Sequence, residues 1–347
     1  KRQRPDYIGF ILSPGYRRSI TKEQALALRE QLDPGIVPVG VFVNATPAYI
    51  QACVDCGAID AVQFHGQESP ADCAAIHGAK KIKVFVTGED PPAPPGSYPV
   101  DYLLFDSEPH SDDYSAYNTA SLVHCVLFQE EQAGYLAGYA AVTDGYTTLG
   151  FIGAREVPGI VRYCTGFLQG AEAAAELQGE YVTLQTWFTD TYENNDAITQ
   201  RMIDWYNNGT SLIMVSGGNL YEGVTGAVNQ TGGKAITTDY DNTELGDRVL
   251  GSAIKCYNAA VQRQLDTFFA AGTWNGQTGG QTEKAGFTNG EVALVAGAPW
   301  RFDSFTQDDY RTLYEDLRTS VLKMDAYSDL DTLPELSLIH ISEPTRQ

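Results

Sequence analysis

Side chains that bind anions or move protons follow short apolar runs in the first hundred residues. Arg17 and Arg18 follow the first of these runs, His65 follows the third, and Asp106 ends the fifth. In parallel barrels and open sheets, chemistry lies at the carboxyl ends of the strands. An arginine, a histidine and a carboxyl group around one rim suit an anionic substrate and proton transfer. Taken singly, the arginines also fit a solvated turn, and the histidine fits a structural role.

A second set of polar residues follows apolar runs further along the chain, namely Gly217 with Gly218, Asp239 and Lys255. The glycine pair belongs to neither G-x-x-x-x-G-K-[ST] nor G-x-G-x-x-G. It is either a strand-to-helix turn that needs backbone freedom or a place where the backbone approaches a ligand. A Ser/His/Asp set is not evident, so hydrolase chemistry has no support.

Alternating strands and helices must position the first set. Strands are predicted at 6–12, 37–43, 61–64, 81–86 and 102–105, with helices at 21–33, 47–56 and 70–76. The first helix begins at Thr21, where Gln24 completes a capping box. Strands that alternate with helices at this spacing indicate a parallel α/β sheet.

The second set lies in longer segments of the same kind. Strands are predicted at 149–152, 182–188, 212–215, 235–238 and 249–254, with helices at 128–139, 160–177, 195–207, 223–229 and 259–269. Gly166 and Gly170 permit close packing of the helix that contains them. This order indicates a doubly wound α/β domain with ligand contacts at its strand ends.

The charge of the chain is unevenly distributed. The net charge is −21 over 347 residues, of which residues 1–106 carry −2 and residues 107–347 carry −19. This asymmetry suggests two parts with different histories. An acidic surface repels phosphate backbones, so nucleic-acid binding is not expected. Apolar runs stay well short of the ~20 residues that a membrane span needs.

The chain start and the cysteines predict little special chemistry. An apolar leader with a cleavage site is absent, so the chain as written is expected to be cytoplasmic, and without an initiating Met its start is expected to be missing. Cys53 and Cys56 form a C-x-x-C late in a predicted helix, away from the helix start that stabilises a redox thiolate. Zinc spacing is lacking, so we expect buried or semi-buried free thiols, no metal and no cofactor.

Four stretches of the first part resemble phosphoribosylanthranilate isomerase. They are 7–18 (YIGFILSPGYRR), 39–44 (VGVFVN), 62–68 (VQFHGQE) and 103–107 (LLFDS). The resemblance covers about residues 1–106 and implies part of a (βα)₈ barrel of tryptophan biosynthesis. That family performs an Amadori rearrangement on phosphoribosylanthranilate with one general base and one general acid.

The resemblance implies roles for four residues. Asp106 matches the general acid, which needs a raised pKa. Arg18 matches a contact to the anthranilate carboxylate, and His65 and Gln63 match a rim that lines the site. The family's Lys-x-Cys-Gly strand with the general-base Cys, its Gly-rich segment after Asp106 and its phosphate-binding loops do not appear. Turnover by this part is therefore not expected.

Stretches of the second part resemble the basic membrane protein family, also called the purine nucleoside receptor family. They include 131–138 (EQAGYLAG), 149–153 (LGFIG), 157–163 (VPGIVRY), 238–241 (TDYD) and 252–255 (SAIK). The resemblance implies an incomplete type I periplasmic-binding-protein-like domain at 107–335 that lacks its N-terminal part. Such proteins are extracytoplasmic, often lipid-anchored nucleoside-binding components of ABC uptake transporters, and their partner is a permease.

This resemblance also implies ligand contacts. Asp239 matches a carboxylate positioned for ribose hydroxyls, two of which it can accept. Gly217 and Gly218 match a strand end where backbone approaches the ligand, and Tyr163 matches an aromatic suited to stacking. Lys255 matches a lysine near the cleft, although a surface lysine is the alternative.

The limits of the two parts are less sharply defined. We expect the join within 102–108, because an apolar strand that ends in Asp fits both neighbours. Residues 336–347 (LSLIHISEPTRQ) fit neither family and resemble a translated sequencing adapter, so we expect a non-native tail outside the fold.

Three hypotheses remain for function: a nucleoside-type solute-binding module, a phosphoribosylanthranilate isomerase, or a non-functional assembly chimera of the two. Because both parts leave unpaired strand edges, we also expect poor solubility or aggregation.

Overall fold

The computed structural model describes residues 7–16, 18–86, 92–106, 124–271, 281–319, 324–327 and 339–342. The chain divides into two compact units, residues 1–108 and 109–347. The expected domain limits stay a prediction, because residues 107–123 lie outside the described ranges.

The first unit contains one parallel sheet whose strands follow each other in chain order. The strands are β1 (Tyr7–Ile11), β2 (Val37–Phe42), β3 (Ala61–Phe64), β4 (Lys80–Val86) and β5 (Tyr102–Asp106). The helices are α1 (Lys22–Arg29), α2 (Pro47–Asp55) and α3 (Pro70–Ala74), followed by the 3₁₀ turn η1 (Pro95–Ser97). The predicted strands and helices of this part are all present.

Local sequence explains where the helices of the first unit begin. Thr21 and Gln24 form the predicted capping box of α1, and Ser69 and Asp72 form another at α3. These pairs satisfy backbone N–H groups that have no partner inside the first helical turn. The prediction that this helix continues to residue 33 is wrong, because α1 ends at Arg29.

The second unit is built on a seven-stranded sheet in the order β13-β11-β10-β9-β7-β8-β14. Its strands are β7 (Thr148–Gly153), β8 (Val182–Phe188), β9 (Leu212–Ser216), β10 (Lys234–Asp239), β11 (Val249–Lys255), β13 (Val292–Val295) and β14 (Ile339–Ser342). Only the pairing of β13 with β11 is antiparallel among the pairings of the described strands. The carboxyl ends of β7 to β11 therefore share one edge of the sheet.

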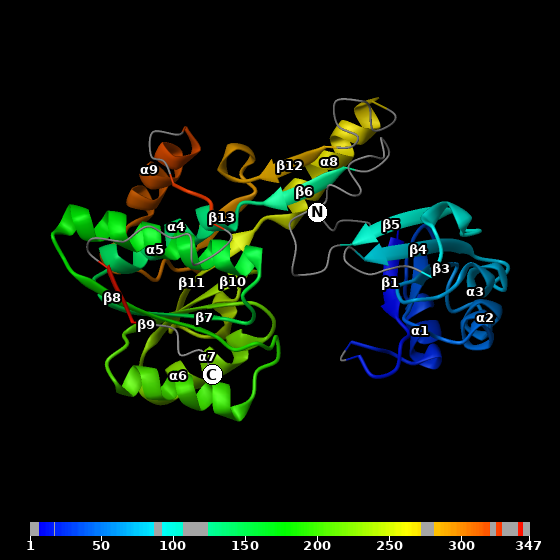
Figure 1. Cartoon of the computed structure of the whole chain (residues 1–347), viewed down its shortest axis with the longest axis horizontal. Coiled ribbons are helices and arrows are strands. Elements are labelled where there is room, and N and C mark those ends of the chain that lie inside the picture. The colour runs from blue at the N-terminus through cyan, green and yellow to red at the C-terminus, as the bar shows by residue number, and fades with distance from the viewer. Residues whose placement is uncertain are drawn as a thin grey trace. The chain divides into compact units, whose positions relative to one another are not determined.

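Helices cover both faces of this sheet, as the doubly wound pattern predicted. They are α4 (Glu130–Thr143), α5 (Pro158–Gln178), α6 (Asp196–Asn207), α7 (Leu220–Thr231), α8 (Tyr257–Ala271) and α9 (Gln307–Arg318), with 3₁₀ turns η2 (Thr243–Leu245) and η3 (Phe287–Asn289). In Figure 1, α4 and α5 lie on one face and α6 and α7 on the other. None of the helices in the described ranges combines the length and apolar character that a membrane crossing requires.

Glycines allow α4 and α5 to touch backbone to backbone. A Cβ at Gly138 of α4 would lie 2.0 Å from the Phe167 carbonyl oxygen, and one at Gly166 of α5 would lie 2.0 Å from the Glu131 carbonyl oxygen. A real side chain at either position would force the helices apart. The predicted close packing of α5 is therefore confirmed, and it brings the start of α4 against the start of α5.

A smaller part of this unit projects from the seven-stranded sheet. Strand β6 (Cys125–Phe128) pairs in parallel with β12 (Thr282–Ala285), and α8 accompanies them (Figure 1). We call β6, β12 and α8 the extension. Its two strands were not predicted, because each has only four residues and the polar Thr282–Ala285 has no apolar alternation.

The expectation that the tail takes no part in the fold is wrong for residues 339–342. They form β14, which pairs in parallel with β8. The edge of a sheet has backbone N–H and C=O groups without partners, and any extended segment of suitable length can pair with them.

Candidate functional site

The Asp239 carboxylate is the centre of the candidate site. Asp239 ends β10 with a φ of 69°, a left-handed conformation that is uncommon outside glycine. The Asp239 side chain is 24% exposed, so a ligand can reach the carboxylate although most of the side chain is covered by its neighbours. Oδ1 accepts a hydrogen bond from the Tyr163 hydroxyl at 3.4 Å, and Oδ2 accepts one from Thr238 Oγ1 at 3.3 Å.

Lys255, at the end of the neighbouring strand β11, joins this carboxylate to a second one. Its Nζ lies 3.2 Å from Asp239 Oδ1 and 2.8 Å from Glu130 Oε1. Burial lowers the pKa of the ammonium, but the carboxylates of Asp239 and Glu130 outweigh burial and raise the pKa well above its ordinary value. With 17% of its side chain exposed, Lys255 is not the surface lysine of the alternative interpretation.

The charge network continues into the helix pair. Arg162 Nε lies 2.7 Å from Glu130 Oε2 and 3.8 Å from Glu131 Oε2. Arg162, Glu130 and Glu131 are each no more than 5% exposed. Burial raises the pKa of Glu131, and the neighbouring Glu130 adds to that rise. The two glutamates that start α4 are therefore buried partners of Arg162.

Aromatic rings surround the ammonium of Lys255. Its Nζ lies 5.9 Å from the centroid of the Phe128 ring and 5.6 Å from that of Tyr163. Tyr257 contacts Phe128 edge-on, with centroids 5.1 Å apart, and lies 5.4 Å from Tyr240. Burial raises the pKa of Tyr257 to about 12. Tyr240 is 65% exposed and so offers a ring face to a ligand.

The stacking role suggested for Tyr163 is wrong in this structure. Tyr163 is 1% exposed, because it lies in the tightly packed part of α5. Its single O–H is shared between two acceptors, Asp239 Oδ1 at 3.4 Å and the Ala253 carbonyl at 3.2 Å. Tyr163 therefore contacts the Asp239 carboxylate from the buried side, and the neighbour of Asp239 in the chain, Tyr240, has an exposed ring.

Gly217 and Gly218 follow β9 with φ values of 98° and 58°. A Cβ on Gly218 would lie 2.0 Å from the Tyr192 carbonyl oxygen. These conformations support the strand-to-helix turn, while contact with a ligand stays a prediction. Burial raises the pKa of Tyr192, Arg155 opposes this and Asp239 adds to it.

Sequence reasoning missed three members of this network, namely Glu130, Glu131 and Arg162. A signal was present for Arg162, which stands alone among the apolar residues at the start of α5. A charged residue inside an apolar helical segment needs a buried partner.

The residues predicted for isomerase chemistry all belong to the first unit. Arg18 is exposed in the segment after β1, and Gln63 of β3 and His65 just after β3 are half-buried. Asp106 ends β5, where its backbone pairs with Val86; its side chain lies outside the described parts, as does Arg17. Parallel strands place these positions along one edge of the sheet, and their catalytic or binding roles stay predictions.

A buried ion pair lies near this edge of the sheet, and the sequence analysis did not predict it. Lys83 Nζ lies 3.3 Å from Glu68 Oε2, and both side chains are 2% exposed. Glu68 also accepts hydrogen bonds from the backbone N–H of Asn44 at 2.8 Å and of Gly66 at 3.0 Å. Lys83 donates to the carbonyl of Gly66 at 2.5 Å. The pair therefore fixes the turns that follow β2 and β3.

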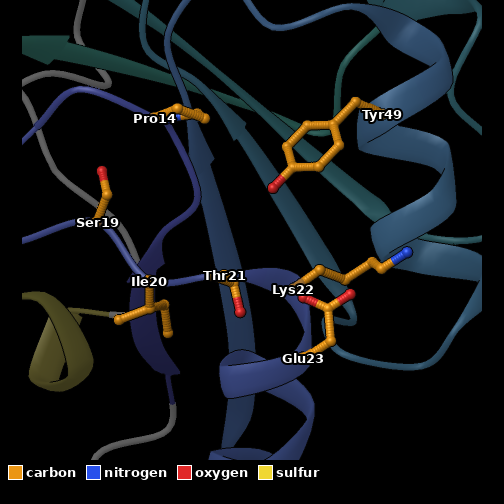
Figure 2. Close-up of a pocket in the computed structure, with 7 residues that line it drawn as sticks. All are labelled: Pro14, Ser19, Ile20, Thr21, Lys22, Glu23 and Tyr49. Atoms are coloured by element: carbon orange, nitrogen blue, oxygen red, sulfur yellow. The ribbon is translucent and has the colours of Figure 1, made fainter.

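The first unit also has a cavity of about 270 Å³ between the start of α1 and Tyr49 of α2. Figure 2 shows the Tyr49 ring above Lys22 and Glu23, with Ser19 and Ile20 across from the ring. Thr21 is engaged in the capping box, and Ser19 Oγ donates to the Ser13 carbonyl. The cavity thus combines one cation, one carboxylate and one phenol, and does not include the predicted site residues.

The cysteines are free thiols in this structure. Cys53 is buried, and burial raises the pKa of its thiol, as it does for Cys73, whose pKa rises to about 11. Cys56 is exposed, contrary to the expectation of a buried or semi-buried thiol, because it lies at the end of α2. Within the described ranges, no group of three or more His, Cys, Asp or Glu residues could hold a metal ion.

Two protein families match different parts of this sequence. Residues 100–316 match the family described as ABC transporter substrate-binding protein PnrA-like, and residues 1–112 match N-(5'phosphoribosyl)anthranilate isomerase. A curated relative of the second kind, from Lacticaseibacillus casei strain BL23, is 46% identical over 82 residues, which are 23% of this chain and 41% of that protein. One from Pelobacter propionicus is 36% identical over 102 residues, which are 29% and 49%. The chain thus spans less than half the length of these two isomerases.

Two solved structures share the fold of this chain with TM-scores above 0.5. An ABC transporter solute-binding protein from Aeropyrum pernix K1 has a TM-score of 0.55 at 14% identity, over 94% of this chain and 95% of that one. A transcriptional activator of the comK gene from Bacillus halodurans has a TM-score of 0.52 at 16% identity, over 94% and 99%. At these identities the likeness concerns the α/β fold alone.

Proposed function

The chain belongs to the PnrA-like ABC transporter substrate-binding family, and on that premise we propose that its second unit binds a neutral solute of the nucleoside type. The observation that carries this proposal is the partly exposed Asp239 carboxylate beside the exposed Tyr240 ring. A carboxylate accepts two neighbouring ribose hydroxyls, and an aromatic face stacks on a base. The partner of such a component is a transporter permease.

The charges around Asp239 favour a nucleoside over a nucleotide. Lys255 is engaged with two carboxylates, and Arg162 is engaged with Glu130. A phosphate group would face the carboxylates of Asp239 and Glu130. The two cations of this network, Lys255 and Arg162, already pair with those carboxylates and would not compensate the added negative charge. Burying such an uncompensated charge is costly, so phosphorylation of the ligand should abolish binding.

Calorimetric titration of the full chain with inosine and with inosine monophosphate tests this proposal. Binding of inosine alone is expected, and Asp239→Asn should weaken it at least about tenfold, because each hydrogen bond to a charged group contributes roughly 1.5–3 kcal/mol. Asp241→Asn is the matched control, since Asp241 instead accepts hydrogen bonds from Thr243. Failure to bind inosine, or equal loss in both variants, would contradict the proposal.

For the first unit we propose a partial (βα)₈ barrel derived from phosphoribosylanthranilate isomerase. The supporting observation is its five parallel strands in chain order, each of β1 to β4 followed by a helix or helical turn. Residues at the carboxyl edge, with Asp106 as general acid and Arg18 as carboxylate contact, are the candidates for the reaction. Because the chain spans under half of the two isomerases compared above, the activity itself stays a second candidate.

The fluorescence change on conversion of phosphoribosylanthranilate tests this second candidate. Turnover by the full chain that disappears in Asp106→Asn would support it. A chain that shows neither turnover nor inosine binding would support the hypothesis of a chimera without either function.

A further inference from the structure

Three connections join the seven-stranded sheet to the extension. Strand β6 leads into α4, β11 leads into α8, and β12 leads back to β13. Backbone hydrogen bonds tie these connections together: Gln129 N–H donates to the Ala285 carbonyl at 2.9 Å, and Cys256 N–H donates to the Glu291 carbonyl at 2.8 Å. We call this region the junction.

Lys255 is placed between the junction and the candidate ligand site. It ends β11, and its ammonium contacts Glu130, the first residue of α4, at 2.8 Å. The same ammonium contacts Asp239 at 3.2 Å. Arg162 holds the other oxygen of Glu130 at 2.7 Å, so this carboxylate is fixed while the ammonium is shared.

We propose that Lys255 is a positioning residue that transmits the state of the Asp239 carboxylate to the junction. When ligand hydroxyls occupy Asp239, or when its charge is removed, the ammonium transfers its hydrogen bonds to Glu130. The Lys255–Glu130 pair then becomes stronger, and it fixes the β6–α4 connection to the β11–α8 connection. The extension thereby becomes more rigid when the site is filled.

Coupling of this kind does not depend on which ligand the site takes. The coupling rests on the proposed function only where it names ligand hydroxyls as the groups that normally engage Asp239. Removal of the Asp239 charge should strengthen the Lys255–Glu130 pair in the same way. Two residues that act through a shared ammonium must be non-additive, whereas independent residues are additive. A double-mutant cycle in the ligand-free chain therefore tests the inference directly.

The measurement is amide hydrogen exchange of residues 125–129 in the full chain. Asp239→Asn should slow exchange in this segment at least threefold, because local opening there becomes less frequent. In a Lys255→Met background the same substitution should have no effect, and Lys255→Arg, which keeps the charge, should restore the coupling. Asp241→Asn should leave exchange unchanged. The inference is overturned if Asp239→Asn does not change exchange. It is also overturned if Asp239→Asn slows exchange equally with Lys255 present and in the Lys255→Met background.

Folding of the variants is checked by the melting curve of each. Lys255→Met leaves Glu130 paired with Arg162, so a folded protein is expected; Lys255→Gln takes its place in the cycle if that variant does not fold. Adding inosine separates the two proposals. If inosine fails to bind, the proposed function fails while the cycle still decides the coupling; if it binds without slowing exchange, the coupling fails.

Discussion

The Lys83 ammonium lies 3.3 Å from the Glu68 carboxylate in the interior of the first unit, with both side chains 2% exposed. The ammonium also donates to the carbonyls of Gly66 and Val84, and the carboxylate accepts two backbone N–H groups. Each charge is therefore compensated by the other and by the turns that follow β2 and β3. Such a pair stabilises a particular arrangement of loops more than it adds net stability.

Replacing Lys83 with Met should destabilise the first unit by about 3–5 kcal/mol, because the buried Glu68 carboxylate loses its counter-charge. All four tryptophans, at 187, 205, 274 and 300, belong to the second unit. Urea unfolding followed by tryptophan fluorescence should therefore be unchanged, while the circular dichroism transition of the first unit shifts to lower urea. A shift in both signals would contradict the independence of the units, and Lys22→Met serves as a control at a half-buried lysine.

Gly138→Ala should destabilise the second unit by about 1–3 kcal/mol, the usual cost of overpacking. The new methyl group would lie 2.0 Å from the Phe167 carbonyl oxygen, where α4 and α5 touch. Gly226→Ala in α7 is the matched control, because its nearest neighbour would lie 3.6 Å away. There the better helix propensity of alanine should stabilise by about 0.5–1 kcal/mol. Urea unfolding by tryptophan fluorescence compares the two, and equal effects would exclude close helix packing as the cause.

The strands that carry the candidate site and two of its residues could be predicted from sequence, but the contacts that join the site residues could not. Short apolar runs that end in a polar residue predicted the positions of Asp239 and Lys255. The contact between Tyr163 and Asp239 joins residues 76 positions apart and depends on how far α5 is rotated against the sheet. The glycines of α5 predicted that this helix packs closely, but they did not show that α4 is the helix it packs against.

Buried charges were the other feature that pattern analysis missed. Glu130 and Glu131 look like ordinary acids in a first helical turn, and Lys83 stands among apolar residues of β4. Their burial follows from partners elsewhere in the chain, Arg162 and Glu68. The four-residue strands β6 and β12 were missed for a related reason, since their pairing is determined by the junction and not by an alternating pattern.

Glu131→Gln should stabilise the second unit increasingly as the pH rises. Burial raises the pKa of Glu131, so the folded chain binds a proton there more tightly than the unfolded chain does. That contribution is fully present below about pH 4, the ordinary range of a glutamate, and is lost as the pH rises through the raised value. Glutamine carries no such penalty. The urea midpoints of the variant and of the unchanged chain should therefore diverge from pH 4 through pH 6 to pH 8, and an equal difference at all three pH values would contradict this prediction.

The edge strand β5 should limit the solubility of the chain. Tyr102, Leu103 and Leu104 are 50%, 43% and 38% exposed, and among the described strands β5 pairs only with β4. An exposed apolar edge is a template for pairing with other chains, and a lysine on such an edge opposes this. Leu103→Lys should therefore lower the weight-average mass in light scattering at a given concentration. Leu177→Lys changes a leucine that is 75% exposed and lies on the helix α5, not on a strand. Pairing through the β5 edge predicts that Leu103→Lys alone reduces association. An equal reduction by Leu103→Lys and Leu177→Lys would instead indicate an effect of net charge.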